Sequence, residues 1–229
     1  MPLDPPHRMD PAEKIAPVLD ALREHYGTPD SPDRDPMEVL VRGILSQNTS
    51  DVNSGRAYEN LLETFGTWET IARADQSQVE KAIASGGLAE RKAETIQSAL
   101  HWLGQRGAYS LDFLDDLPAE EGEKSLRQIK GIGVKTARLI LLFGFEMPTF
   151  VVDTHVLRVS QRLRLVPANC GREKAHRLLS AVVPADRTYT AHINMIRHGR
   201  SMCSPSNPDC EECPIQQWCV HVRESHASQ

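Results

Sequence analysis

Apolar residues recur every three or four positions along most of the chain, which is the spacing of one face of an α-helix. Asp10-Pro11 precedes the first such run and Asp35-Pro36 the second. Both pairs predict a helix start, because aspartate caps a first helical turn and proline fits its first residue. Gly27 ends the first helix, and Thr67 and Asp75 are expected to cap two short ones. Further helices are expected after Asp51 through Phe65 and over residues 68–74, 79–83, 91–104, 125–129, 134–143, 154–165, 172–182 and 189–198. No strand-like alternation of useful length occurs, so the expected fold class is all-α.

The chain has 229 residues, 40% of them hydrophobic and 25% charged, as is ordinary for a globular protein with one sizeable core or two small ones. No apolar run approaches the length of a membrane span, and residues 1–10 lack the apolar segment of a secretory signal. We therefore expect a cytoplasmic monomer with no membrane partner. Residues 1–9 are rich in proline and are expected to form a disordered tail.

The formal net charge of −5 argues at first against nucleic acid, because DNA affinity depends on Lys and Arg neutralising phosphates. The distribution of charge reverses that argument. Residues 121–200 carry 14 Lys and Arg against 6 Asp and Glu, so this stretch is net +8 while the remainder is net −13. A basic surface is therefore expected where residues 121–200 fold.

The stretch around Gly131-Ile132-Gly133 is expected to form a helix, a hairpin and a second helix. Residues 125–129 can form a short helix, the glycines break it, and residues 134–143 have the apolar content of a buried helix. Glycine permits backbone conformations and close approaches that a Cβ would block, and amides beside a helix N-terminus can bind a phosphate. A plain turn between two helices is the alternative.

Lys135 lies in the second, mostly apolar helix, where an ammonium is costly to desolvate unless it has a partner or a function. Asp153 is a candidate partner, and it also stands where it can cap the helix that begins at Thr154. A lysine becomes nucleophilic only as the neutral amine, and a neighbouring carboxylate can accept its proton. The two residues are therefore a candidate catalytic pair, with a plain helix cap as the alternative for Asp153.

These residues resemble the motif of the helix-hairpin-helix DNA glycosylases, and in particular of the endonuclease III family. That family has Leu-Pro-Gly-Val-Gly, one residue, then Lys-Thr-Ala, and later Val-Asp-Thr-His with an arginine. The corresponding residues here are Ile129-Lys130-Gly131-Ile132-Gly133, Val134, Lys135-Thr136-Ala137, Val152-Asp153-Thr154-His155 and Arg158. The resemblance extends over roughly residues 30–222.

The resemblance implies that Lys135 is the nucleophile and lyase residue and that Asp153 is the essential carboxylate. It also implies DNA contacts from the hairpin residues, Thr154 and His155. Lys130 replaces the family's proline, which loosens the hairpin but adds a charge near phosphate. The implied architecture is a six-helix domain over residues 29–146 that contains the hairpin, and an iron-sulfur cluster domain of residues 10–28 and 147–229, with the DNA-binding cleft between them.

Two other turns carry candidate DNA contacts through the same resemblance. The polar segment that contains Gln47 and Asn48 stands where the family lies near the flipped nucleotide, with Asn48 in place of the usual glutamine. Leu88 stands where relatives carry a residue that enters the DNA stack. A helix cap for the first turn, and a leucine that packs its own turn for the second, are the alternatives.

Four cysteines near the C-terminus follow the pattern Cys-x6-Cys-x2-Cys-x5-Cys: Cys203, Cys210, Cys213 and Cys219. Disulfides are disfavoured in a reducing compartment, and four thiolates suit tetrahedral zinc. The spacing resembles that of the endonuclease III family, which implies one iron-sulfur cluster (4Fe-4S) held by all four, with structural zinc as the alternative. Cys170 is left over as a small core residue. Relatives carry Lys or Arg between the first two ligands, whereas residues 204–209 carry none, so phosphate contact by this loop is in doubt.

Together these features indicate a bifunctional DNA glycosylase and AP lyase that removes oxidised pyrimidines from damaged double-stranded DNA and cuts the 3′ side by β-elimination. A monofunctional mismatch or uracil glycosylase is one alternative, although relatives of that kind commonly lack a lysine at the position of Lys135. A non-catalytic sensor of DNA damage or redox state is the other. No diffusible cofactor is expected.

Overall fold

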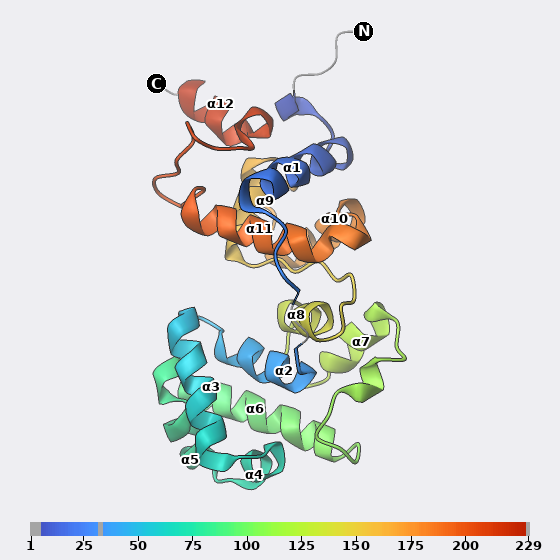
Figure 1. The fold of residues 1–229 in the computed structure, drawn as a ribbon, viewed down its shortest axis with the longest axis vertical. Helices are drawn as coiled ribbons and strands as arrows, with labels where there is room; N and C mark the ends of the chain where they lie inside the picture. The colour runs from blue at the N-terminus through green and yellow to red at the C-terminus, as the bar shows by residue number, and fades with distance from the viewer. Residues whose placement is uncertain (1–5, 32–33, 228–229) are drawn as a thin grey trace. The chain divides into compact units, whose positions relative to one another are not determined.

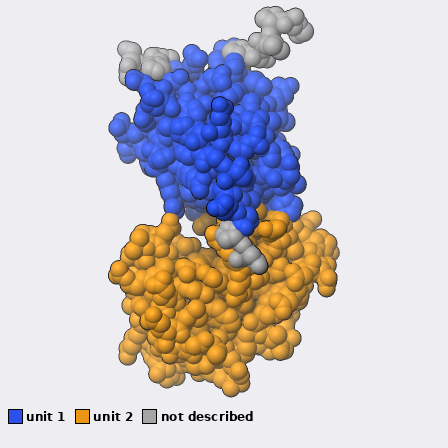
Figure 2. Space-filling model, viewed as in Figure 1, with its two compact units in different colours: residues 1–31, 148–229 blue, residues 32–147 orange. Residues whose placement is uncertain are grey.

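The computed structural model describes residues 6–31 and 34–227, and every regular element within them is helical, which confirms the all-α class. The chain divides into two compact units, shown in Figure 2. The first, residues 32–147, is called here the hairpin unit. The second joins the residues up to Ser31 to those from Pro148 onward, and is called the cysteine unit. Among the described residues, no helix is long and apolar enough to cross a membrane.

The hairpin unit contains helices α2 to α8 among its described residues (Figure 1). Their bounds are Pro36–Leu45 (α2), Asp51–Phe65 (α3), Trp68–Arg73 (α4), Gln76–Ala82 (α5), Ala89–Gly104 (α6), Ala119–Leu126 (α7) and Val134–Gly144 (α8), with 3-10 turns at Ala84–Gly86 (η2) and Asp112–Leu114 (η3). The resemblance implied six helices. The described helices include the short α4 and α5, which the sequence predicted as separate helices and which the extended backbone of Ala74, with a ψ of 154°, divides.

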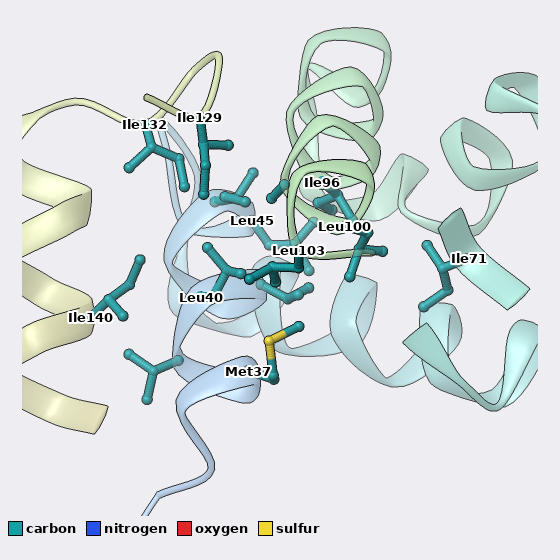
Figure 3. Packing of buried hydrophobic residues seen from close by; sticks show 14 of the residues in the cluster. Met37, Leu40, Leu45, Ile71, Ile96, Leu100, Leu103, Ile129, Ile132 and Ile140 are labelled. Atoms are coloured by element: carbon teal, nitrogen blue, oxygen red, sulfur yellow. The ribbon is translucent and has the colours of Figure 1, made fainter. Parts of the chain in front are cut away.

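Helix α2 forms the centre of the hairpin unit's core. Its residues Leu40 and Ile44 are fully buried. Helix α6 packs on one side through Ile96 and Leu100, and α8 packs on the other through Ile140 (Figure 3). Burying each of these side chains contributes about 1.5–3 kcal/mol. The core therefore fixes α8, and with it the residues that follow the hairpin.

The cysteine unit contains five α-helices among its described residues (Figure 1). They are Pro11–Tyr26 (α1), Thr154–Arg162 (α9), Arg172–Val182 (α10), Thr188–Ser201 (α11) and Val220–Ala227 (α12), with 3-10 turns at Pro6–Arg8 (η1), Ala185–Arg187 (η4) and Gln216–Trp218 (η5). Helix α11 packs against both α1 and α9. Its Met195 lies in a buried cluster with Val18 and Leu22 of α1 and with Val156 and Val159 of α9.

Most of the capping signals read from the sequence are confirmed. The side chains of Asp10 and Asp35 each accept the backbone N–H two residues later, at 2.9 Å. Thr67 accepts the N–H three residues later, at 3.2 Å, and Gly27 ends α1 with a φ of 78°. The prediction for Asp75 was wrong, because its side chain makes no capping hydrogen bond to α5.

The helix before the hairpin differs from its prediction. It spans Ala119–Leu126 instead of residues 125–129. Pro118 supplies the start, since its backbone is extended and the acidic Glu120 and Glu121 follow in the first turn, where the helix dipole favours them. After Leu126 the chain continues in single turns to the hairpin glycines.

Helix α9 also ends earlier than predicted, at Arg162 instead of Leu165. Arg164 adopts a left-handed φ of 56°, which ends the helix. The amides of Leu165 and Val166 then return to the carbonyl of Ser160.

Part of the expected N-terminal tail is ordered. Residues 1–5 lie outside the described residues, but Pro6–Arg8 forms η1, because the buried Lys14 ammonium donates to the carbonyl of His7 at 2.9 Å. The division between the units falls after residues 31 and 147, whereas the sequence suggested residues 28 and 146.

Candidate active site

The hairpin between α7 and α8 is anchored by two isoleucines and turned by two glycines. Ile129 and Ile132 are buried and point into the core of the hairpin unit (Figure 3). Gly131 and Gly133 are exposed. Gly131 has a φ of 89°, and a Cβ there would overlap the side chain of Thr95. The fold therefore requires glycine at position 131.

At Gly133, by contrast, the fold leaves room for a side chain. Its backbone is extended, with a φ of −95°, and nothing lies within 4 Å of where its Cβ would be. It is also the N-cap of α8, so the first backbone N–H groups of that helix have no partner within it. The fold does not require glycine here, and the open space lies directly beside an anion-attracting helix end.

Lys130 does not present an unpaired charge at the hairpin. Its Nζ lies 2.5 Å from Glu94 Oε1, and the two side chains are 74% and 47% exposed. An exposed pair of this kind contributes little to stability, about 0–1 kcal/mol. Lys130 can therefore exchange Glu94 for another anion at low cost.

Lys135 is the second residue of α8 and is half-buried. The next residue, Thr136, is buried and its hydroxyl accepts a hydrogen bond from Gln47 Nε2 at 3.4 Å. This contact joins α8 to the polar turn after α2. The structure thus brings together Lys135, the hairpin and the segment that contains Gln47 and Asn48.

The polar turn and the Leu88 turn both have left-handed residues. Asn48 is exposed and has a φ of 52°, a conformation that asparagine tolerates better than most residues. Leu88 has a φ of 50° and a side chain that is 55% exposed. Because more than half of Leu88 is exposed, packing within the protein offsets little of this strain.

Lys92 holds these two turns together, and this contact was not predicted from the sequence. It is 2% exposed, and its ammonium donates to Leu45 O at 2.7 Å and to Gly86 O at 2.8 Å. Burial lowers the pKa of Lys92. A signal was present in the sequence, because Lys92 is four residues before the buried Ile96 and so lies on the apolar face of α6.

Asp153 lies in the cysteine unit and caps α9. Its Oδ1 accepts the backbone N–H of Val156 at 2.7 Å, as predicted. Two buried histidines hold the extended segment before it, since His192 Nδ1 contacts Val151 O at 3.0 Å and His176 Nδ1 contacts Phe150 O at 3.2 Å. These supports were not predicted from the sequence, although both histidines lie beside apolar positions of α10 and α11.

Thr154 and His155 follow Asp153 at the start of α9. Thr154 is exposed, whereas His155 is half-buried and its Nδ1 accepts from Arg158 Nη2 at 3.1 Å. Arg158 also donates to Gly199 O at 2.7 Å and to Cys203 O at 2.8 Å. The arginine of the motif therefore links α9 to the first of the four clustered cysteines.

Cys203, Cys210, Cys213 and Cys219 line one cavity in the cysteine unit, and none is in a disulfide. Burial raises the pKa of Cys213 to about 12, and burial likewise raises the pKa of Cys219 and Cys210. Because burial disfavours the thiolate, cysteines in this cavity ionise readily only beside a cationic group. A 4Fe-4S cluster takes one thiolate on each iron, so four cysteines that line a single cavity fit it.

Arg162 lies against this cavity. Its Nη1 donates to Cys203 Sγ at 3.1 Å and to Ser204 O at 2.7 Å, and its Nη2 donates to Pro205 O at 2.9 Å. Its charge is therefore directed at the ligand loop. The fifth cysteine, Cys170, is buried in the core of the cysteine unit, as expected.

Comparison with known families accounts for both units. The family of HhH-GPD superfamily base excision DNA repair proteins matches residues 41–185. The iron-sulfur binding domain of endonuclease III matches residues 203–219, which begin and end at cluster cysteines.

Individual relatives agree with these matches. Endonuclease III of Thermotoga maritima is 33% identical over 82% of this chain and 84% of its own length. A relative from Arabidopsis thaliana, named as a candidate DNA glycosylase, is 36% identical over 73% of this chain, which spans 57% of that longer protein. The solved structure of a trapped endonuclease III–DNA covalent intermediate superposes with a TM-score of 0.80 and 26% identity over 94% of this chain and 98% of that one.

The hairpin, the lysine after it, the capping aspartate and the four cysteines thus occur in a fold shared with DNA-bound relatives. The protein is a base excision DNA glycosylase and AP lyase that binds DNA and carries one 4Fe-4S cluster, and the chain belongs to the endonuclease III family of helix-hairpin-helix DNA glycosylases.

Proposed function

We propose that this enzyme removes oxidised pyrimidines from duplex DNA and cuts the strand on the 3′ side by β-elimination, with Lys135 as nucleophile. The observation that carries the proposal is the place of Lys135, which is the second residue of α8, directly after the glycine hairpin. The helix N-terminus and the open space at Gly133 suit a backbone phosphate, which would bring the adjoining nucleotide to the lysine. The trapped covalent intermediate of the relative supports the same kind of chemistry.

In the proposed reaction the neutral Lys135 amine attacks C1′ of the flipped nucleotide. The glycosidic bond breaks, and its electron pair leaves with the base, which takes up a proton. Opening of the sugar then gives a Schiff base. Loss of a C2′ proton expels the 3′ phosphate and cuts the strand.

Asp153 is proposed to accept the proton of Lys135 or to stabilise the positive charge that develops on the sugar. Its Oδ1 is held by the amide of Val156, so the carboxylate is oriented before substrate arrives. Asn48 and Leu88 are proposed to fill the space left by the flipped nucleotide. Both are exposed, and each lies in a turn a few residues after a carbonyl that accepts a hydrogen bond from Lys92. The 4Fe-4S cluster, held by the four cysteines, organises the C-terminal residues of the cysteine unit and takes no part in these steps.

Borohydride trapping tests the proposal. Duplexes that contain thymine glycol, a uracil mismatch or an abasic site are incubated with the enzyme and reduced, and the covalent adduct is measured. We expect an adduct with thymine glycol and with the abasic site, and none with Lys135→Gln, which should still fold and bind DNA. Base release from uracil without an adduct would indicate the monofunctional alternative instead.

Asp153→Asn separates the two functions of Asp153. Asparagine also caps helices, so thermal stability should change by less than about 0.5 kcal/mol, while turnover should fall by about 10²-fold or more. Turnover equal to wild type, measured under single-turnover conditions, would reduce Asp153 to a helix cap.

A further inference from the structure

A pocket of about 560 Å³ lies in the hairpin unit beside the proposed nucleophile. Its apolar wall comes from Leu139 and Phe143 of α8. Lys135, Leu139 and Phe143 are spaced by four residues, so they share one face of α8, and the pocket begins within one helical turn of the lysine. Ser46, at the start of the polar turn, closes the same pocket. The volume is ample for one nucleobase.

The polar wall of this pocket includes an ion pair on α2, together with Arg34, Asp51 and Ser54. Arg42 Nε donates to Glu38 Oε1 at 2.6 Å, and the two side chains are 42% and 37% exposed. The Arg42 guanidinium also stacks at 4.1 Å over the ring of Tyr58, which is buried. Burial raises the pKa of Tyr58 to about 12, so its hydroxyl stays neutral. Arg42 is thus held by its Nε and by its flat face.

The ion pair with Glu38 and the stacking on Tyr58 leave the Nη groups of Arg42 and the Oε2 atom of Glu38 available to a ligand. No other hydrogen bond joins the Arg42 Nη groups or Glu38 Oε2 to the described part of the chain. The pair therefore presents a donor and an acceptor side by side, on side chains that are already oriented. A ligand that supplies an acceptor next to a donor can bind both at once, with charge-assisted hydrogen bonds.

The base edges of damaged pyrimidines differ in how they meet this requirement. A thymine- or uracil-type ring has an imide edge, in which N3–H lies between the O2 and O4 carbonyls. This edge offers a donor next to an acceptor on either side, whichever way round the base enters. A cytosine-type ring has an acceptor at N3, so a carboxylate placed at that position meets a lone pair instead of a donor.

From this geometry we infer that Glu38 and Arg42 are specificity-determining residues that select damaged pyrimidines with an intact imide edge over cytosine-type lesions. The inference rests on the proposed function, since it assigns a lesion class to the same site. Glu38 accepts from N3–H and Arg42 donates to the neighbouring carbonyl. Leu139 and Phe143 line the pocket around the ring.

Two lesions that differ only at this edge provide the test. 5-Hydroxyuracil and 5-hydroxycytosine are placed in otherwise identical duplexes, and kcat/KM for base release is measured for each. Wild type should prefer 5-hydroxyuracil by about tenfold, as expected when a site built to hydrogen-bond one edge meets the other. Arg42→Ala and Glu38→Gln should bring the ratio close to 1. Cleavage of an abasic duplex, which has no base to contact, normalises the rates for each variant.

A matched control is available on α4. Glu69 and Arg73 form another pair four residues apart, at 2.6 Å, away from this pocket. Arg73→Ala should leave the lesion ratio at the wild-type value. Arg42→Lys keeps a charge beside Glu38 but loses the planar fork, so it should also lower the ratio, and it serves if Arg42→Ala fails to fold.

The outcomes separate this inference from the proposed function. No covalent adduct between wild type and an abasic duplex would overturn the proposed function. Normal abasic cleavage together with an unchanged lesion ratio in the Arg42 and Glu38 variants would overturn the assignment of the pocket alone. Equal loss of abasic cleavage and base release in those variants would show a structural role for the pair, and would likewise overturn the assignment.

Discussion

Gly131 and Gly133 stand two residues apart in the hairpin, yet they lack side chains for different reasons. At Gly131 both the positive φ of 89° and the side chain of Thr95 exclude a Cβ. At Gly133 neither the backbone conformation nor any neighbouring atom excludes a Cβ. The sequence pattern predicts a glycine turn but cannot make this distinction, because Thr95 lies 36 positions earlier and meets the hairpin only in the folded unit. The first glycine serves the fold, and the second is free to serve a ligand.

Substitution of each glycine by alanine should separate these roles. Gly131→Ala should lower the free energy of unfolding by about 1–3 kcal/mol, from backbone strain and overlap with Thr95. Gly133→Ala should lower it by less than about 1 kcal/mol, but should weaken DNA binding about tenfold because the methyl group meets the phosphate backbone. Urea unfolding and fluorescence anisotropy with a short duplex measure the two effects. Unchanged DNA affinity in Gly133→Ala would mean that the hairpin does not contact DNA at that residue.

At the scale of helices, the sequence predicted starts with a capping side chain better than uncapped starts or tertiary contacts. Asp10 and Asp35 were recognised because capping depends on the residues immediately around them. The helix before the hairpin was misplaced by six residues at its start, since Gly122 hid its continuity from Ala119. Lys92 was not predicted, because its acceptors are the last residues of α2 and η2, Leu45 and Gly86, and only the fold brings these together.

Lys92→Met tests whether this lysine positions both turns. Methionine fits a similar volume but leaves the carbonyls of Leu45 and Gly86 without their donor, so stability should fall by about 1–3 kcal/mol. If the turns present Asn48 and Leu88 to DNA, the affinity for an abasic duplex should fall further than for undamaged DNA. Wild-type discrimination between the two duplexes would confine Lys92 to stability.

The pH dependence of stability gives a separate readout of Lys92. Its pKa is lower in the folded protein than in the unfolded chain, so the unfolded chain binds more protons at pH values between the two. The free energy of unfolding therefore rises with pH across that interval, as the penalty for burying an ammonium disappears. Lys92→Met should show a smaller rise, measured by urea unfolding from neutral to alkaline pH.

At the scale of the whole molecule, short motifs predicted far more than composition did. The net charge of −5 gives no sign of a DNA-binding protein, whereas the spacing of the four cysteines indicates the cluster directly. Lys135 and Asp153 could each be identified from adjacent residues. Glu38 and Arg42 could not, because on sequence alone an acidic and a basic residue four apart indicate an exposed helix pair, and only the pocket gives them a further role.

Loss of one cluster ligand should affect the protein more than loss of the unrelated cysteine. Cys213→Ser removes a thiolate from the cavity, so soluble yield, iron content and visible absorbance should all fall, because ligand binding contributes folding free energy. Cys170→Ser is the matched control, since Cys170 is buried outside that cavity, and it should keep the iron. Metal and sulfide analysis of both variants is the measurement. About one zinc per chain and no iron in wild type would contradict a 4Fe-4S cluster.

The ligand loop allows the charge distribution of the whole molecule to be tested. Residues 204–209 carry no positive charge, and Arg162 is turned toward the carbonyls of Ser204 and Pro205. Ser206 and Asn207 are exposed, so arginine can replace both without loss of packing. Each new phosphate contact steepens the slope of log affinity against log salt by about 0.9.

The double variant Ser206→Arg/Asn207→Arg should therefore bind undamaged duplex more tightly and with a slope steeper by up to about 1.8, if both arginines reach phosphates. The single-turnover rate should stay at the wild-type value, because Lys135 and Asp153 are unchanged. Fluorescence anisotropy across a salt series measures the slope. Placing the same two arginines at Ser77 and Gln78 on α5, which are also neutral and exposed, adds the same charge away from the loop and controls for added charge alone. Equal slopes in both double variants would show that the gain comes from net charge, and identical slopes in wild type and the loop variant would show that this loop does not face DNA.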